Sequence, residues 1–308
     1  MATVLITSEF FGKFDDAARK MLVNAGHKVI DNPYGHKFLS PEEIIPYARD
    51  SDAFICDLEK ITKEVIDAAP KLKIISRRGV GVDNVDCRYA DSKGIEVART
   101  LGIVEAPVAE LVMAYILHFS RNVSQMNTMM HQGIWQKLMS LSVEGETLGI
   151  AGMGNIGIQV AKRAAAFGMK ILYYSRSRNE VAEKEYGAKK ASFDELLSAS
   201  DFISVNMALT EETRGLFDYT AFSKMKQSAY FINTARGAII NEQDLKKALD
   251  EKLISGAALD VFDIEPQTES IFKGMDNVIL TPHIGSFTRE VFIKMDIAAA
   301  ENVIRRFK

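Results

Sequence analysis

Three charged side chains follow short apolar runs in the second half of the sequence, where buried strands would end: Arg236, Glu265 and His283. Ligands of open α/β sheets bind at the carboxyl ends of the strands, so these side chains are candidates for one site. A histidine with an ordinary pKa of about 6.5 can take a proton from a hydroxyl group and return it. A glutamate beside it would stabilise the imidazolium, and an arginine would hold a carboxylate while polarising the adjacent carbonyl. The set therefore predicts proton transfer next to a carboxylate.

A glycine-rich turn lies earlier in the chain, at Gly152, Gly154 and Gly157. It follows a predicted strand and opens a predicted helix, the setting in which a G-x-G-x-x-G turn binds a dinucleotide. One glycine permits the tight turn, one lets the backbone approach a pyrophosphate, and one lets helix and strand pack closely. The backbone N–H groups at the start of the helix, at Asn155 and Ile156, would face the anion. We expect a dinucleotide cofactor here.

The next predicted strand is followed by four polar residues, Ser175, Arg176, Ser177 and Arg178. About twenty residues beyond the glycines, a site that prefers NAD usually carries an acidic residue against the ribose diol. A carboxylate would repel a 2′-phosphate, whereas a hydroxyl and a guanidinium can bind one. The segment therefore favours NADP(H), with NAD(H) as the second choice. The alternative is that these residues form a solvated turn without a cofactor contact.

The elements that would position these residues alternate regularly along the chain. Short β-branched runs alternate with amphipathic stretches, which is the pattern of βα units with helices packed on a parallel sheet. In the first part, strands are predicted at residues 4–6, 28–30, 53–55, 73–75 and 95–97, and helices near 14–25, 41–50 and 62–69. In the second part, strands are predicted at residues 147–151, 171–174, 202–205, 230–232, 256–259 and 278–280. The fold class is α/β.

A long helix is predicted between the two series, from Ala106 to about Met130, with Pro107 suited to its first turn. We expect its apolar stripe to lie in the core, and its methionine-rich end to pack in the core or on a second subunit. A final helix within residues 286–308 is expected to fold back over the first part.

The chain has 308 residues, a length typical of two domains. Its 38 Lys and Arg residues and 41 Asp and Glu residues give a net charge of −3, without the basic excess that nucleic-acid phosphates require. We expect no nucleic-acid partner and no metal ion. Cys56 and Cys87 do not make a disulfide framework, so the expected compartment is the reduced cytoplasm. No apolar run approaches the roughly 18 residues of a membrane helix, so no membrane partner is expected either.

These motifs and several others occur in an order that resembles the D-isomer-specific 2-hydroxyacid dehydrogenases. That family includes D-3-phosphoglycerate dehydrogenase and hydroxypyruvate/glyoxylate reductase. The resemblance covers essentially the whole chain. It is carried by the glycine-rich turn and by segments at residues 77–86, 108–110, 210–215, 233–237, 259–262, 265–266 and 281–283.

The resemblance implies a fold of two doubly wound parallel-sheet domains, in which a Rossmann cofactor domain is inserted into a flavodoxin-like substrate domain. The substrate domain would comprise residues 1–99, completed by 285–308, and the dinucleotide-binding domain would comprise residues 100–284. The family also implies a homodimer formed through the long helix that contains Pro107.

In the family that the chain resembles, the arginine of an Ala-Arg-Gly segment binds substrate, and a glutamate before proline pairs with the histidine that transfers the proton. Those positions are Arg236, Glu265 and His283 here. The implied activity is that of an NAD(P)-dependent D-2-hydroxyacid dehydrogenase, or 2-keto acid reductase, with hydride transfer at C2. Formate dehydrogenases carry glutamine where this chain has Glu265, so a hydroxyacid is favoured over formate.

The resemblance also implies contacts outside the proton-transfer set. The backbone of Val80 and Gly81 would bind the substrate carboxylate, and Asp260 would contact the nicotinamide carboxamide. Thr213 and Ala235, in matching segments, are expected at the cofactor.

The sequence also departs from the family pattern near the expected cofactor. Ser175 stands where many relatives have aspartate, which disfavours NAD. The segment Asn206-Met207-Ala208 replaces the more usual His-x-Pro, and Val104 replaces an asparagine of several relatives.

The substrate is left open by the sequence. Arg77 matches an arginine that phosphoglycerate-type relatives use toward the phosphate, and Arg78 adds a second positive charge, so both are candidates to bind a second anionic group. The alternative is that one or both pair with surface carboxylates. A short-type NAD-dependent D-3-phosphoglycerate dehydrogenase is therefore a second hypothesis. A third is a non-catalytic, cofactor-sensing interaction protein, because transcriptional corepressors share this dehydrogenase fold.

Overall fold

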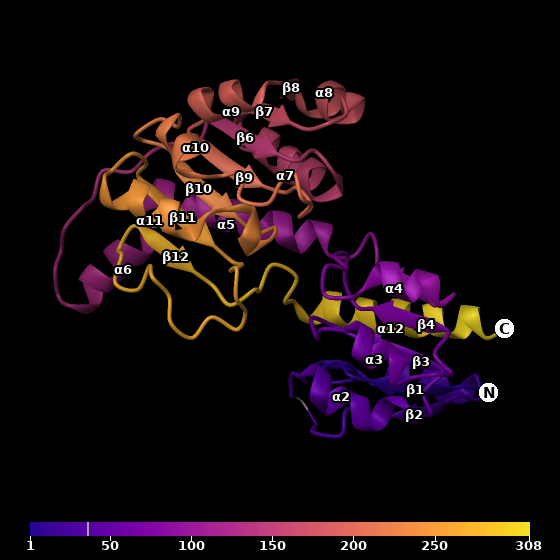
Figure 1. The fold of residues 1–308 in the computed structure, drawn as a ribbon. Coiled ribbons are helices and arrows are strands. Elements are labelled where there is room, and N and C mark those ends of the chain that lie inside the picture. The colour runs from indigo at the N-terminus through magenta and orange to yellow at the C-terminus, as the bar shows by residue number, and fades with distance from the viewer. Residues whose placement is uncertain (36) are drawn as a thin grey trace. The chain divides into compact units, whose positions relative to one another are not determined.

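A computed structural model describes residues 1–35 and 37–308 of the chain. The described residues fall into two compact units (Figure 1). The terminal unit comprises residues 1–104 and 286–308, and the central unit comprises residues 105–285.

The terminal unit is built on a parallel sheet in the order β2-β1-β3-β4-β5, which is the predicted flavodoxin-like order. Its strands are β1 (Thr3–Ile6), β2 (Lys28–Ile30), β3 (Ala53–Cys56), β4 (Ile74–Arg77) and β5 (Glu96–Arg99). Its helices are α1 (Ala17–Asn24), α2 (Pro41–Ala48), α3 (Lys63–Asp67), α4 (Cys87–Ser92) and α12 (Arg289–Arg306).

Helices cover both faces of this sheet, and successive strand residues point to opposite faces. Leu5 and Phe54 pack with α2 and α3 on one face, whereas Ile6 and Ile55 pack toward α1 and α12 on the other. Helix α12 contacts α1 and β4 and contributes Val303 to the core. The prediction that the final helix folds back over the first part of the chain is therefore confirmed.

The central unit contains a second parallel sheet, in the order β12-β11-β10-β9-β6-β7-β8. Its strands are β6 (Thr147–Ala151), β7 (Lys170–Tyr174), β8 (Lys189–Lys190), β9 (Phe202–Val205), β10 (Tyr230–Asn233), β11 (Gly256–Leu259) and β12 (Val278–Leu280). Its helices are α5 (Glu105–Arg121), α6 (Val123–His131), α7 (Asn155–Ala166), α8 (Glu180–Tyr186), α9 (Phe193–Ala199), α10 (Tyr219–Ser223), the 3₁₀ turn η1 (Gly237–Ile239) and α11 (Glu242–Asp250). The strand order reverses between β6 and β9, as it does in Rossmann folds.

The single long helix predicted from Ala106 to about Met130 is wrong: the chain forms α5 and α6, separated at Asn122. Asn122 has a left-handed backbone (φ 50°), which asparagine tolerates better than most residues, and its Nδ2 donates to the Met139 carbonyl. The apolar pattern of the sequence did not predict two short elements, α4 and β8. Strand β8 consists of two exposed lysines at the sheet edge.

Candidate active site

The glycine-rich turn joins β6 to α7 at the point where the strand order reverses. Gly152 has a φ of +103°, and a Cβ there would lie 2.7 Å from the backbone of Asn206 and Met207. A Cβ at Gly157 would lie 2.2 Å from the Gly152 carbonyl oxygen, so helix and strand pack closely at this position. The first and third glycines are therefore required by the fold itself.

Gly154 differs from the other two glycines of the turn. The space that a Cβ would occupy there is open, with no heavy atom of the described residues within 4 Å. The first N–H groups of α7, which begins at Asn155, have no acceptor within the helix, and the positive end of the helix dipole lies there. An open backbone approach beside free N–H donors fits a pyrophosphate group. Asn155 and Ile156 would present those donors.

The two predicted arginines in the segment after β7 have different surroundings. Arg178 pairs with Glu183, with Nη2 and Oε2 2.6 Å apart. Arg176 is exposed, and within the described residues no carboxylate lies within 4.0 Å of its guanidinium. Ser175 is half-buried and Ser177 is exposed. Arg176 is thus the arginine of this segment that remains accessible to a phosphate.

Two further predicted cofactor residues have roles within their own loops. The hydroxyl of Thr213 accepts from the Thr210 N–H group and donates to the Ala208 carbonyl, at 2.8 and 2.7 Å. The Ala235 N–H group donates to the side chain of Asn233 at 3.0 Å. These contacts shape the loops after β9 and β10.

His283 and Glu265 are in direct contact. The His283 Nδ1 and Glu265 Oε2 atoms are 2.7 Å apart, and the two side chains are 25% and 28% exposed. The other carboxylate oxygen of Glu265 accepts from the Phe262 N–H group at 2.9 Å. The pairing orients the imidazole, so that its second nitrogen is available for a proton transfer.

Arg236 follows β10 in a turn. The Asn233 Nδ2 atom donates to the Arg236 carbonyl at 2.9 Å and stabilises this turn. The next residue, Gly237, packs directly on the chain that leads to Glu265. A Cβ at Gly237 would lie 1.9 Å from the carbonyl carbon of Phe262. The turn that carries Arg236 and the loop that carries Glu265 are therefore packed backbone to backbone.

Arg236 and His283 also control the charge of Glu265. Burial alone would raise the pKa of Glu265. The hydrogen bond and charge of His283, the Phe262 N–H group and the charge of Arg236 outweigh burial and hold that pKa below its usual value. Glu265 is therefore ionised at neutral pH, as a partner for an imidazolium must be.

Asp260, at the end of β11, is fully buried and is used within the protein. Its Oδ1 accepts from the Ile284 N–H group and its Oδ2 from the Gly285 N–H group, both at 2.8 Å. Its main-chain carbonyl accepts from the His283 N–H group at 2.9 Å. Burial raises its pKa, although these N–H donors act in the opposite direction. Asp260 thus holds the segment that carries His283.

The two arginines predicted to meet a second anionic group of the substrate are buried in the terminal unit. Arg77 donates through Nη1 to the Arg78 carbonyl and lies against Gly79. Arg78 is 1% exposed and pairs with Asp57 and with Asp296. The geometry of Arg78 thus favours pairing with carboxylates over contact with a substrate. Of these carboxylates Asp296 is buried and Asp57 is half-buried.

Val80 and Gly81 follow the buried arginines and are half-buried. Val80 packs on a cluster that includes Phe10 and Phe292. Its carbonyl accepts a long hydrogen bond of 3.5 Å from Arg99. Their predicted contact with a carboxylate stays a prediction.

The other histidines have different surroundings. The Nδ1 atom of buried His27 accepts from the Ala2 N–H group at 3.2 Å, and His118 lies 3.1 Å from the Ser124 hydroxyl. His131 is exposed in α6, and His36 lies outside the described residues. His283 is the one paired with a carboxylate among the histidines that the structure describes.

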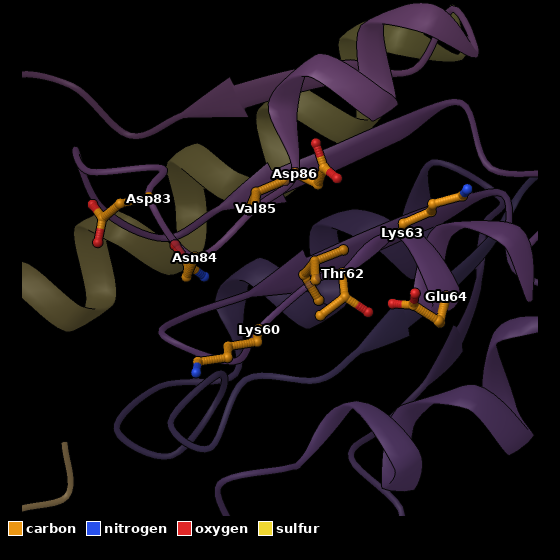
Figure 2. A pocket seen from close by; sticks show the side chains of 9 residues that line it. Lys60, Thr62, Lys63, Glu64, Asp83, Asn84, Val85 and Asp86 are labelled. Atoms are coloured by element: carbon orange, nitrogen blue, oxygen red, sulfur yellow. The ribbon is translucent and has the colours of Figure 1, made fainter. Parts of the chain in front are cut away.

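A pocket of about 420 Å³ lies in the terminal unit, beside the start of α3. Figure 2 shows Lys60, Thr62 and Lys63 at this pocket, with Asp83 and Asp86 from the segment between β4 and α4. None of the predicted site residues lines it. We assign it no role in the chemistry.

The described residues contain no group of three or more His, Cys, Asp or Glu side chains suited to a metal ion. None of the helices in residues 1–35 and 37–308 is long and apolar enough to cross a membrane. Cys56 and Cys87 are both free thiols.

Sequence reasoning missed Thr234 and Tyr115, and it named Asn206 only as a departure from the family pattern. The Asn206 Oδ1 and Thr234 Oγ1 atoms are buried and have no hydrogen-bond partner in the described structure. Asn206 follows β9, which borders the reversal point, and Thr234 follows the next strand, β10. The hydroxyl of Tyr115 contacts Thr281, two residues before His283. Unsatisfied atoms and contacts across the fold leave no pattern in a sequence.

Comparisons with known proteins found a matching family model and similar proteins. The family model described as D-isomer specific 2-hydroxyacid dehydrogenase, NAD binding domain, matches residues 113–285. A glyoxylate reductase of Thermococcus litoralis is 41% identical over 272 residues, covering 85% of this chain and 82% of the relative. A hydroxypyruvate reductase of Thermotoga maritima is 36% identical over 301 residues, covering 94% and 95%. The crystal structure of a glyoxylate reductase from Paecilomyes thermophila has a TM-score of 0.85 at 30% identity, covering 98% and 94%.

Proposed function

The chain belongs to the D-isomer-specific 2-hydroxyacid dehydrogenases and is an oxidoreductase that uses a nicotinamide cofactor. From that membership, we propose that it reduces a small 2-keto acid to the D-2-hydroxy acid, with His283 as the proton donor. The observation that carries the proposal is the contact between His283 and the ionised Glu265, half-buried at the carboxyl ends of the strands.

The proposed reaction moves one hydride and one proton. When bound, NAD(P)H would supply the hydride for C2 of the keto acid. As charge develops on the carbonyl oxygen, His283 delivers a proton from its second ring nitrogen, and Glu265 stabilises the imidazolium before that transfer. In the oxidation direction, the same imidazole takes the hydroxyl proton.

Arg236 is proposed to bind the carboxylate of the keto acid through its planar guanidinium and to polarise the neighbouring carbonyl. Its charge acts on Glu265, which places its guanidinium near the proposed proton-transfer pair. The backbone of Val80 and Gly81 remains a second proposed contact for that carboxylate.

We propose glyoxylate and hydroxypyruvate as the substrates to test first, because relatives at 41% and 36% identity are named for reducing them. The burial of Arg77 and Arg78 argues against a substrate that carries an additional phosphate. A short-type phosphoglycerate dehydrogenase and a non-catalytic binding protein become outcomes of the test.

The experiment is steady-state oxidation of NADPH and of NADH against glyoxylate, hydroxypyruvate, pyruvate and phosphohydroxypyruvate. We expect turnover with the unphosphorylated acids. Phosphohydroxypyruvate as the best substrate by a wide margin would favour the phosphoglycerate alternative. Cofactor binding without turnover of any acid would favour the interaction protein.

For the cofactor, we propose a preference for NADP(H) that depends on Ser175 and Arg176. Arg176→Ala should weaken NADPH binding by roughly tenfold or more, the value of a charge-assisted hydrogen bond, and change NADH binding little. Arg178→Ala is the matched control, since Arg178 already pairs with Glu183. Titration of nicotinamide fluorescence measures both. Equal losses for the two cofactors would contradict the preference.

We also propose a homodimer that involves α6 and the segment after it. No residue of α6 is buried, and the following segment exposes Trp135 and Met139 at 82% and 94%. Exposed apolar side chains of this size mark interaction surfaces. Light scattering coupled to size exclusion should give twice the chain mass for the native protein, and Trp135→Ser with Met139→Ser should shift it toward the monomer. A native monomer would contradict the proposal.

A further inference from the structure

His283 has a left-handed backbone. Its φ is 54°, in a region that residues other than glycine adopt in only a few per cent of cases, although histidine adopts it more often than most. Such a conformation persists only where the surroundings hold it. The surroundings here are Asp260, whose carboxylate accepts from the N–H groups of Ile284 and Gly285 and whose carbonyl accepts from that of His283.

The carboxylate of Asp260 is in turn joined to a distant helix through two hydroxyl groups. The Thr281 hydroxyl donates to Asp260 Oδ1 at 2.5 Å, and the Tyr115 hydroxyl lies 2.5 Å from the same Thr281 oxygen. Tyr115 is 4% exposed, on α5, and burial raises its pKa. The phenol therefore keeps its proton and donates it to Thr281, since the single proton of Thr281 is used on Asp260.

We propose that Tyr115 and Thr281 are positioning residues for the proton transfer, acting through Asp260 to hold His283 against Glu265. The inference rests on the proposed function. It adds that α5, which supplies no residue to the predicted catalytic set, fixes the geometry of the catalytic histidine. None of the three hydroxyl and carboxylate groups needs to touch the substrate for this role.

The physical reason is the dependence of catalysis on the placement of the imidazole. The N–H groups of Ile284 and Gly285 converge on the buried Asp260 carboxylate, and the His283 N–H group donates to the Asp260 carbonyl. If Thr281 no longer donates to that carboxylate, Oδ1 loses one donor and the segment can leave its left-handed turn. The distance of 2.7 Å between His283 and Glu265 then lengthens. His283 and Arg236 are the charged groups that act on Glu265. The imidazole would move away from Glu265, whereas Arg236 would stay in place.

The first test compares Thr281→Val, which keeps the shape and removes the hydroxyl, with Thr281→Ser, which keeps the hydroxyl. We expect Thr281→Val to lower kcat by about tenfold, since misplacement of a reacting group by a fraction of an ångström costs that much. The KM for the keto acid and the Kd for the cofactor should each change by less than about threefold. Thr281→Ser should recover most of the lost kcat.

The second test uses Tyr115→Phe, which keeps the buried ring and removes the hydroxyl. This variant should lower kcat by about threefold, because the contact with Thr281 is weakened. Its matched control is Tyr219→Phe, which removes a hydroxyl that donates to Glu251 at 2.7 Å elsewhere in the same unit. Tyr219→Phe should leave kcat and the His283 signal described below unchanged.

A spectroscopic readout separates positioning from a general loss of structure. The chain has five histidines, so the Nδ1 proton of His283 can be assigned by NMR of ¹⁵N-histidine-labelled protein, through its loss in a His283 variant. Its low-field resonance should move upfield in Thr281→Val and in Tyr115→Phe, and stay in place in Tyr219→Phe.

The outcomes distinguish this inference from the proposed function. A wild-type protein that reduces keto acids, with variants at positions 115 and 281 that keep its kcat and its His283 resonance, would overturn the positioning role alone. A wild-type protein that reduces no keto acid would overturn the proposed function, and the resonance would still show whether the two hydroxyl groups hold His283. If Thr281→Val does not fold, the kcat and the His283 resonance of Tyr115→Phe and Thr281→Ser test the positioning role.

Discussion

Two ion pairs at strand ends differ in what surrounds them. In the central unit, His283 and Glu265 are 25% and 28% exposed at 2.7 Å. In the terminal unit, Arg78 and Asp296 are 0% and 2% exposed at 2.6 Å. The first pair can exchange protons with a ligand, whereas the second is enclosed by the core. Accessibility, more than residue type or spacing, separates a pair that can do chemistry from one that holds a fold together.

The buried pair belongs to a larger cluster. Arg78 also pairs with Asp57 and donates to the Ser8 hydroxyl at 2.9 Å. Glu59 lies beside it, fully buried, and its Oε2 accepts from the Asp57 N–H group at 2.6 Å. Burial and the neighbouring Asp57 carboxylate raise the pKa of Glu59 to about 8. The cluster joins residues at the ends of β1, β3 and β4 to α12.

The largest effect on stability is expected from Arg78→Met. The change leaves the buried Asp296 and the half-buried Asp57 without their cation, and removing one partner of a buried pair typically costs about 3–5 kcal/mol. Hydrogen exchange measured by mass spectrometry on peptides of residues 1–104 should show a loss of protection of that size. Peptides of the central unit report whether the effect is local. A loss below about 1 kcal/mol would mean that Arg78 is not a structural cation.

Glu59→Gln should change how stability depends on pH. A folded-state pKa of about 8 means that the folded chain holds a proton that the unfolded chain has released above about pH 4.5. The free energy of unfolding of the terminal unit should therefore fall as pH rises from about 5 to about 8, by at most about 1.4 kcal/mol per pH unit.

The glutamine variant cannot titrate, so this decline should flatten. Hydrogen exchange of the β1 and β3 peptides at several pH values measures it. A wild-type protein whose stability rises across the same window would contradict the raised pKa.

The smallest effect is expected from Arg19→Met, the matched control for the buried arginine. Arg19 binds Asp31 through Nε and Nη2, the latter at 2.6 Å, but the side chains are 44% and 56% exposed. Exposed pairs contribute about 0–1 kcal/mol, and salt screens them. The same exchange experiment should show little change. A loss equal to that of Arg78→Met would remove the distinction between exposed and buried pairs.

Much of the fold was predictable because buried strands are short, apolar and rich in β-branched residues. Strand β6 (Thr147–Ala151) has the predicted bounds, and so do β9, β11 and β12. The break between α5 and α6 was not predictable from that pattern. The apolar stripe continues past it, and the break depends on one backbone angle at Asn122 and its bond to the Met139 carbonyl.

The candidate site divides in the same way. The contact between Glu265 and His283 follows from topology, since each comes after a strand and β11 and β12 are parallel neighbours. The burial of Arg78 depends on Asp296, which is 218 residues away in the sequence. The contact of Tyr115 with Thr281 spans 166 residues. Positions after strands can be inferred from the sequence, whereas pairings between remote side chains require the structure.

The most direct test of the proposed chemistry is the turnover of His283→Ala with saturating cofactor and keto acid, beside His118→Ala as a control in the same unit. General acid–base catalysis contributes about 10²–10⁴-fold, so kcat should fall by that factor. The Kd for the cofactor should stay unchanged, and His118→Ala should behave as the native protein. A His283→Ala protein that keeps more than about a tenth of the native kcat would contradict the assignment of His283 as the proton donor.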